Sequence, residues 1–212
     1  MQILLSEIDI SYIGQLLSTE PHLLLETGNK YSIQAPSGVG KSTLMHVLYG
    51  LHREYVGSYT LDGKNIKDFT IDEWVKIRQS IISVVFQGFR LIQDLTVKEN
   101  IEIKSSLSNF PGSKIFDYAT TLGIIQLMDN KVSNLSFGQQ QRVALLRALC
   151  QPFKWLLLDE AFSHLDKHNA EKAIQLIIEC VDNNNAGLIV AETKPSNLLI
   201  NFKPVLINDY VS

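Results

Sequence analysis

The sequence predicts an α/β fold with a mainly parallel sheet, an N-terminal antiparallel β subdomain and an inserted helical lobe. Short apolar runs alternate with helical patterns along the chain, and a glycine-rich loop stands between a predicted strand and a predicted helix. Glycines and prolines divide the stretch 88–135 into short helical pieces. We therefore expect a single domain over 1–212, with a core of 1–87 and 136–212 and a lobe of 88–135.

The expected strands are apolar, partly β-branched runs. They cover Gln2–Ile10, Leu23–Glu26, Lys30–Gln34, Ser58–Leu61, Ile81–Phe86, Trp155–Leu158, Leu188–Ala191 and Val205–Ile207. Thr27 to Asn29 are typical of a hairpin turn between the second and third of these strands. Apolar residues at helical spacing predict helices over Lys41–Leu51 and Asn169–Val181, and another helix after Ser136.

The composition is that of an ordinary globular protein. The chain has 212 residues, of which 45% are hydrophobic, and a formal net charge of -3. There is no basic run, so we expect no nucleic-acid partner. Signal-peptide features are missing, and every apolar run is shorter than the ~18 residues needed to span a bilayer. Two cysteines in apolar segments are typical of buried thiols in a reducing compartment. We expect a cytoplasmic protein that meets a membrane only through a partner.

A phosphate-binding loop is predicted at APSGVGKST, between a strand and a helix. Its glycines let backbone N–H groups turn toward a polyphosphate, which the positive end of the helix also attracts. Lys41 would reach the β- and γ-phosphates, and the Ser42 hydroxyl would bind Mg²⁺. The predicted nucleotide-binding residues of this phosphate-loop NTPase core are Ala35, Pro36, Ser37, Gly38, Val39, Gly40, Lys41, Ser42 and Thr43.

One position departs from the usual loop motif, because Ala35 stands where the motif begins with glycine. Alanine tolerates positive φ poorly. Either the turn keeps φ negative at this residue or the loop accepts strain.

Two acids follow the apolar run of KWLLLDEAF. Ligands of open α/β sheets bind at the carboxyl ends of strands. Asp159 would therefore support Mg²⁺, and Glu160 would activate the attacking water as the catalytic base. The alternative is a strand that simply runs out into solvent.

A third motif, LSFGQQQR, precedes a predicted helix. Ser136 and Gln139 have the spacing of a capping box, so this segment is either a well-capped helix or a second anion site at a helix N-terminus. Physical reasoning alone leaves the two open.

The motifs APSGVGKST, VVFQ, LSFGQQQR and LLLDEAFSHLD occur in the order found in the nucleotide-binding subunit of an ATP-binding cassette (ABC) transporter, which the chain resembles over nearly its whole length. LSFGQQQR is the most specific of them. Ser136 follows Lys41 by 136 − 41 = 95 residues, and Glu160 follows Ser136 by 160 − 136 = 24, spacings that fit the family.

The resemblance implies a role for each motif. Tyr12 would stack on adenine, and Gln87 would contact Mg²⁺, take part in catalysis and link the site to the membrane part of the transporter. Ser136, Gly138 and Gln139 would contact ATP bound to a second subunit, and Ser163–Asp166 would lie at the subunit interface, with His164 as an interface residue rather than a general base. The implied cofactors are ATP and Mg²⁺, with Ser42, Gln87 and Asp159 at the metal.

Phe86–Ile101 is similar to the corresponding segment of lipoprotein-release and macrolide-export ATPases. In that family the lobe docks on the membrane subunits, so the resemblance implies a contact through 88–101, with Phe89, Arg90 and Leu91 as candidates. The implied location is the inner face of the cell membrane, held there by the partner.

The chain departs from the family at Glu192, where a histidine that contacts the γ-phosphate is usual. A carboxylate there would repel the phosphate, so Glu192 points away, is protonated, or pairs with a cation such as Lys194. This favours an alternative function, a hydrolytically weak, ATP-gated regulatory subunit. A soluble ABC protein of DNA repair or translation is opposed by the short chain, and a phosphate-loop kinase by LSFGQQQR.

Overall fold

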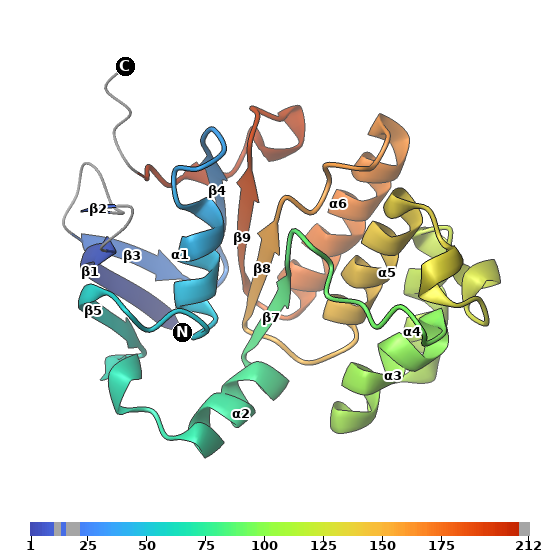
Figure 1. Cartoon of the computed structure of the whole chain (residues 1–212), viewed down its shortest axis with the longest axis horizontal. Coiled ribbons are helices and arrows are strands. Elements are labelled where there is room, and N and C mark those ends of the chain that lie inside the picture. The colour runs from blue at the N-terminus through green and yellow to red at the C-terminus, as the bar shows by residue number, and fades with distance from the viewer. Residues whose placement is uncertain (11–13, 16–21, 208–212) are drawn as a thin grey trace.

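The computed structural model describes residues 1–10, 14–15 and 22–207. A parallel sheet forms its centre, in the strand order β10, β4, β9, β8, β7 (Figure 1). Its strands are β4 (Lys30–Gln34), β7 (Ile82–Val85), β8 (Trp155–Asp159), β9 (Gly187–Glu192) and β10 (Lys203–Pro204). All of these strands run in the same direction, so their carboxyl ends meet at one edge.

A second, antiparallel sheet is built around the N-terminal strand. Its strands are β1 (Gln2–Ile10), β2 (Gly14–Gln15), β3 (His22–Glu26), β5 (Val56–Leu61) and β6 (Lys64–Asn65). Strand β1 pairs with β2, β3 and β5, and β6 pairs with β5. The predicted hairpin at Thr27–Asn29 is wrong, because β3 and β4 belong to different sheets. The turn instead carries the chain from one sheet to the other.

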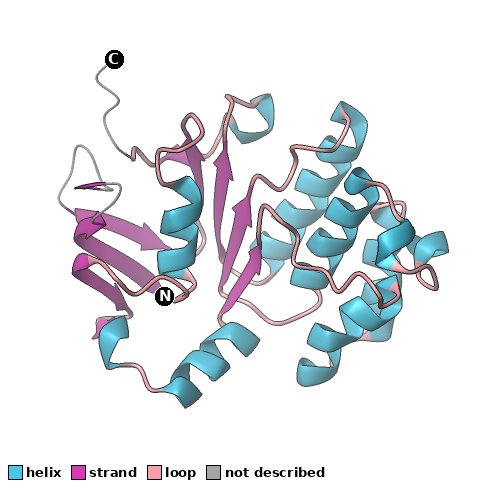
Figure 2. Ribbon diagram, viewed as in Figure 1, coloured by secondary structure: helices cyan, strands magenta, loops and turns pink. Residues whose placement is uncertain are grey.

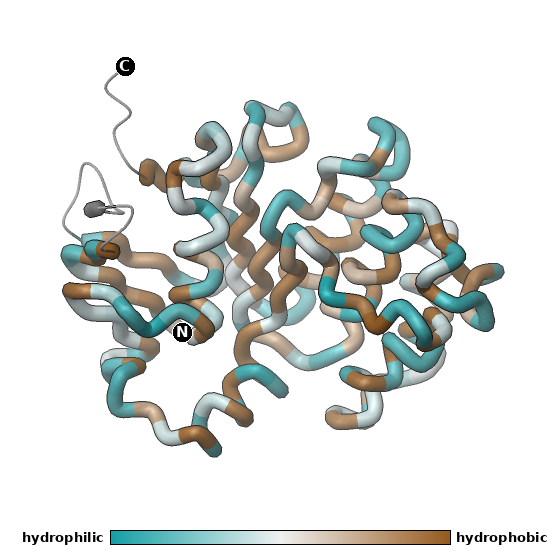
Figure 3. Tube along the Cα trace, viewed as in Figure 1, coloured by the Kyte–Doolittle hydropathy of each residue, from teal (hydrophilic) through white to brown (hydrophobic). Residues whose placement is uncertain are grey.

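Side chains of the parallel sheet alternate between two hydrophobic cores, as expected for strands covered on both faces. Trp155 and Leu157 face the core shared with α1 (Lys41–Leu48) and the antiparallel sheet. Leu156 and Leu158 face the core shared with the helices on the other side. The hydropathy colouring shows the apolar residues concentrated along these central strands (Figure 3). The buried sheet thus gives the loops at its carboxyl edge a rigid base.

The remaining helices lie around this base (Figure 2). They are α2 (Ile71–Ser80), α3 (Val97–Ser108), α4 (Gly112–Thr121), α5 (Phe137–Leu149) and α6 (Lys167–Asn183), with short 3₁₀ turns at Ile66–Asp68, Ile125–Leu127, Val132–Asn134 and Asn197–Leu199. Helices α3 and α4 occupy the predicted lobe, beside α5 and α6 (Figure 1). The α/β fold class is therefore confirmed. Among the described residues, no helix is both long and apolar enough to cross a lipid bilayer.

Two elements differ from the sequence prediction. Helix α2 was not predicted, although Thr70 and Glu73 form a capping box at its start. The last strand lies at Lys203–Pro204 rather than at Val205–Ile207. Val205 and Ile207 are buried by side-chain packing, while the parallel pairing to β4 is made by the two residues before them.

Candidate functional site

The phosphate loop connects the end of β4 to the start of α1, as predicted. Gly38 and Gly40 have φ values of 90° and 100°, a left-handed region in which L side chains are strained. Gly40 is the N-cap of α1 and has no side chain to cap it. Backbone N–H groups at the start of α1 therefore remain available for an anion.

Ala35 is tolerated because its backbone avoids the left-handed region. It is not among the residues with positive φ. Its N–H donates a hydrogen bond to the carbonyl of Glu192, at 3.3 Å. Of the two possibilities left by the sequence, the unstrained turn is the one the structure adopts.

A cavity of about 300 Å³ lies over the loop. It is lined by Ser37, Gly38, Gly40, Lys41, Ser42, Thr43, Gln87 and Glu160. The ammonium of Lys41 is buried and donates to the carbonyls of Ala35 and Pro36, at 2.7 Å each. The cavity thus combines a fixed cation, glycine backbone, a helix N-terminus and a carboxylate.

Asp159 ends β8 inside the protein rather than in solvent. Its side chain is buried, and its Oδ1 atom has no hydrogen-bond partner among the described residues. Burial raises the pKa of this carboxyl, as does the nearby Glu160, while the Ser42 hydroxyl and Lys41 oppose the shift. A buried carboxylate oxygen without a donor, beside a hydroxyl, fits a hydrated Mg²⁺ that also binds phosphate.

Glu160 lies at the cavity in a strained conformation. Its φ is 50°, which a non-glycine residue rarely adopts. The Gln87 amide donates to Glu160 Oε2 at 3.1 Å, and the amide of Gln141 donates to the Glu160 carbonyl at 3.0 Å. Strain of this kind persists only where neighbouring groups fix it, and here two glutamine side chains do so.

The LSFGQQQR segment begins α5 with a complete capping box. Ser136 Oγ accepts from the N–H of Gln139 at 3.3 Å, and the Gln139 side chain accepts from the N–H of Ser136 at 2.9 Å. A side chain at Gly138 would meet the His164 carbonyl at 2.8 Å, so glycine is required there. Ser136, Gly138 and Gln139 do not line the cavity over the phosphate loop of their own chain.

The comparison with known proteins identifies these motifs as a set. The family model described as "ABC transporter" matches residues 19–163, which include the phosphate loop, the capped helix and both acids. The chain belongs to the ABC transporter family. This match confirms the predicted family, and the chain is an ATP-binding cassette.

Several curated proteins are similar to the cassette. The macrolide export ATP-binding/permease protein MacB of Shewanella sp. (strain W3-18-1) is 34% identical over 80% of this chain and 27% of its own length. The methionine import ATP-binding protein MetN of Haemophilus ducreyi is 36% identical over 80% of this chain and 49% of its own length. The lipoprotein-releasing system ATP-binding protein LolD of Buchnera aphidicola subsp. Schizaphis graminum is 34% identical over 79% of this chain and 75% of its own length. The chain thus spans about a quarter to a half of the first two relatives.

Solved structures agree with this assignment. The dimeric bacterial ABC transporter cassette MJ0796 superimposes with a TM-score of 0.80 at 28% identity, covering 92% of this chain and 89% of that one. A dimeric post-hydrolysis state of MJ0796 bound to ADP and Pi gives a TM-score of 0.75.

The other predicted residues differ in whether the structure describes them and in how exposed they are. Tyr12 lies outside the described residues. Phe89 and Leu91 are buried, so Arg90 is the exposed side chain among the three predicted partner contacts. Sequence reasoning missed Gln141, which is fully buried and also accepts from the N–H of His164 at 3.0 Å. Its position five residues after Ser136 gave no signal of this role.

Glu192 ends β9 beside the phosphate loop and is 9% exposed. Its Oε1 atom has no hydrogen-bond partner, and within the described part of the chain no ion pair joins it to Lys194. Burial raises the pKa of the Glu192 carboxyl to about 7, and the carboxylates of Glu160 and Asp159 add to this; the Phe162 N–H and Lys41 oppose it. Of the three possibilities, protonation is the one this environment favours.

This raised pKa makes stability depend on pH. The folded protein holds the Glu192 proton more tightly than the unfolded chain, so the free energy of unfolding falls as pH rises from about 4.5 to about 7. A shift of this size corresponds to about 3 kcal/mol. We expect Glu192→Gln to match the parent at pH 4.5 and to be more stable at pH 8, measured by urea unfolding without nucleotide. The same difference in Glu102→Gln, an exposed glutamate on α3, would contradict this.

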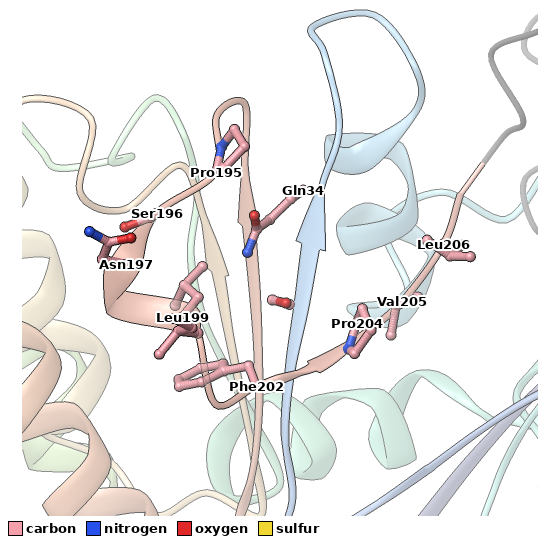
Figure 4. A pocket seen from close by; sticks show the side chains of 11 residues that line it. Gln34, Pro195, Ser196, Asn197, Leu199, Phe202, Pro204, Val205 and Leu206 are labelled. Atoms are coloured by element: carbon pink, nitrogen blue, oxygen red, sulfur yellow. The ribbon is translucent and has the colours of Figure 1, made fainter.

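A second cavity, of about 500 Å³, lies between β4 and the segment after β9 (Figure 4). Gln34, Leu199 and Phe202 are among the side chains that line it. None of the predicted site residues lies in its wall. The predicted phosphate chemistry converges on the smaller cavity over the loop.

Proposed function

We propose that the cassette binds Mg²⁺–ATP in the cavity over the phosphate loop and hydrolyses it to power a membrane transporter. The observation that carries this proposal is the convergence of Lys41, Ser42, Gln87 and Glu160 on one cavity, with Asp159 buried beside Ser42. These groups supply a cation for the phosphates, oxygens for a metal ion and a base for water.

The chemistry follows from these positions. The Glu160 carboxylate accepts a proton from water, whose oxygen forms a bond to the γ-phosphorus while the bond to the β–γ bridging oxygen breaks. The products are ADP and inorganic phosphate. Gln87 orients the Glu160 carboxylate through its hydrogen bond, and Lys41 stabilises the charge on the phosphate oxygens.

The residues that would hold Mg²⁺ are Ser42 and Asp159, with Gln87 nearby. Bound Mg²⁺ would neutralise charge on the β- and γ-phosphate oxygens. No group of three or more acidic, histidine or cysteine side chains forms a metal site among the described residues. Mg²⁺ keeps several waters and binds through few protein oxygens plus substrate phosphates.

The working form of the cassette is a dimer. Ser136, Gly138 and Gln139 lie outside their own phosphate cavity, so they serve the ATP bound to a second subunit, as in the dimer implied by the family. The dimeric MJ0796 structures support this arrangement. The second subunit is another copy of this chain or a related cassette.

The partner in transport is a membrane subunit, contacted through the 88–101 segment, and the cassette works at the inner face of the cell membrane. MacB, MetN and LolD are named for export, import and lipoprotein release, so the relatives leave the cargo and direction open. Affinity purification of the tagged full chain from solubilised membranes tests whether it carries a membrane subunit. Mg²⁺-dependent ATPase assays on the purified protein test whether it hydrolyses ATP. A chain that neither hydrolyses ATP nor carries a membrane subunit would contradict it.

A second candidate, a hydrolytically weak subunit gated by ATP, is favoured by Glu192. Because its pKa is raised to about 7, Glu192 is ionised above neutral pH, where a third carboxylate beside Asp159 and Glu160 opposes the build-up of negative charge during hydrolysis. We expect the parent enzyme to be slow and Glu192→His to raise the rate of ATP turnover by about tenfold or more, since a histidine can donate to the phosphate. Steady-state phosphate release measures this. A fast parent enzyme that the substitution impairs would contradict the weak-subunit candidate.

A further inference from the structure

His164 lies in the loop after β8, and its imidazole ring contacts aromatic rings from two other segments. The ring centre is 5.8 Å from that of Phe89, in an edge-to-face arrangement with an angle of 79°. It is 5.6 Å from the ring centre of Phe137, with the two planes 27° apart. Phe89 belongs to the turn after β7, and Phe137 is the first residue of α5. Three segments that are distant in the sequence therefore meet at one side chain.

The same imidazole is hydrogen-bonded toward Glu160, the proposed base. Its Nδ1 atom lies 2.9 Å from the Ser163 hydroxyl, and that hydroxyl donates to the Glu160 carbonyl at 3.0 Å. A serine hydroxyl has a single proton, so the proton shared by Ser163 and His164 comes from Nδ1. The imidazole thus holds the Ser163 hydroxyl in the direction of the Glu160 backbone.

The backbone of His164 is fixed against α5. Its N–H donates to Gln141 Oε1 at 3.0 Å, and a Cβ atom on Gly138 would approach its carbonyl to 2.8 Å. The stacked ring of Phe137 adds a third contact from the same helix. The imidazole is therefore held in one place although the residue is exposed.

These contacts form a closed ring around the hydrogen bond between the Gln87 amide and Glu160 Oε2, which is 3.1 Å long. From Glu160 the contacts run through Ser163 to His164. They return from His164 through Phe89, two residues after Gln87. Phe89 has a φ of 56°, a strained conformation that persists only where neighbouring groups fix it. His164 thus contacts both the segment that carries Gln87 and the segment that carries Glu160.

We propose that His164 is a positioning residue for ATP hydrolysis, which holds the Gln87 and Glu160 side chains in the geometry that activates water. His164 does not line the phosphate cavity, so it acts through its neighbours and not as an acid or base on the substrate. A misplacement of about 1 Å at reacting groups can lower a rate by about a hundredfold. The inference rests on the proposed function, because it assigns a residue to that reaction.

The test measures the steady-state kinetics of the full chain with Mg²⁺–ATP. We expect His164→Ala to lower kcat by about ten- to a hundredfold while KM stays within about threefold of the parent. His164→Phe keeps the ring contacts and His164→Asn keeps a donor near the position of Nδ1, so each should recover part of the loss. The matched control is His168→Ala, at an exposed histidine of α6, which should turn over ATP like the parent.

A double-mutant cycle with Ser163→Ala tests the path of the effect. Because His164 acts partly through the Ser163 hydroxyl, His164→Ala should lower kcat by a smaller factor in the Ser163→Ala protein than in the parent. Thermal unfolding without nucleotide shows whether each variant is folded. If His164→Ala does not fold, a lower kcat in His164→Phe or His164→Asn supports the proposal, and parent-like kcat in both overturns it.

The remaining outcomes separate this proposal from the proposed function. Parent-like kcat in a folded His164→Ala protein overturns the positioning role while the ATPase activity itself survives. A loss confined to KM, or equal losses in the two backgrounds of the cycle, also overturns it, because His164 would then act on binding or independently of Ser163. No turnover by the parent chain contradicts the proposed function, and the role of His164 falls with it.

Discussion

Glu160→Gln is expected to reduce ATP turnover by about 10²- to 10⁴-fold while nucleotide affinity stays within a few-fold of the parent. The amide has nearly the shape of the carboxylate but cannot accept the proton of the attacking water. Its oxygen can still accept the 3.1 Å hydrogen bond from Gln87, so the local geometry is retained. Phosphate release and fluorescent-nucleotide binding measure the two quantities.

The control for this prediction is Glu171→Gln, on α6 outside the cavity over the phosphate loop. It should leave both turnover and affinity unchanged. Because Glu160→Gln keeps ATP intact, this variant should also favour the dimer. Size-exclusion chromatography with Mg²⁺–ATP detects the dimer. Full turnover in Glu160→Gln would show that another group activates the water.

Lys41→Ala is expected to weaken ATP binding by about a hundredfold or more. The Lys41 residue is only 4% exposed, so the attraction of its ammonium for phosphate is little screened by water. With the lysine removed, the negative charge of the triphosphate faces the carboxylates of Asp159 and Glu160 with less compensation. Equilibrium binding of a fluorescent ATP analogue measures the loss.

Lys41→Ala also removes the hydrogen bonds to the carbonyls of Ala35 and Pro36, so stability must be followed alongside affinity. Thermal unfolding without nucleotide separates the two effects. Lys30→Ala is the matched control, because it removes a lysine whose partner is the partly exposed Asp182. Parent-like affinity in a folded Lys41→Ala protein would mean that nucleotide binds elsewhere.

Much of the fold was predictable from local pattern. The run at Trp155–Leu158 could only be a buried strand, and α6 showed a clear apolar stripe. Helix α2 was missed because it contains more polar than apolar residues, although the capping box at Thr70 could be recognised in the sequence. The turn at Thr27–Asn29 suited a hairpin locally, but strand pairing across the molecule decided otherwise.

The site was predictable where motif and chemistry coincide. Lys41, Ser42, Gln87 and Glu160 meet at one cavity, as the resemblance implied. The character of Glu192 depended on burial and on charges from other strands, which sequence spacing does not reveal. Gln141 was missed because a glutamine inside a helix gives no signal of the two loops it joins.

The position of Gln141 has a consequence for the two sites of the proposed dimer. Helix α5 begins with the residues that, in the proposed dimer, would serve the partner's ATP, and Gln141, five residues after Ser136, donates to the carbonyl of the chain's own Glu160. Any shift of α5 on closing over one nucleotide therefore also acts on the base at the other. Two sites linked in this way influence each other's affinity equally, so the dimer should fill cooperatively rather than as two independent halves.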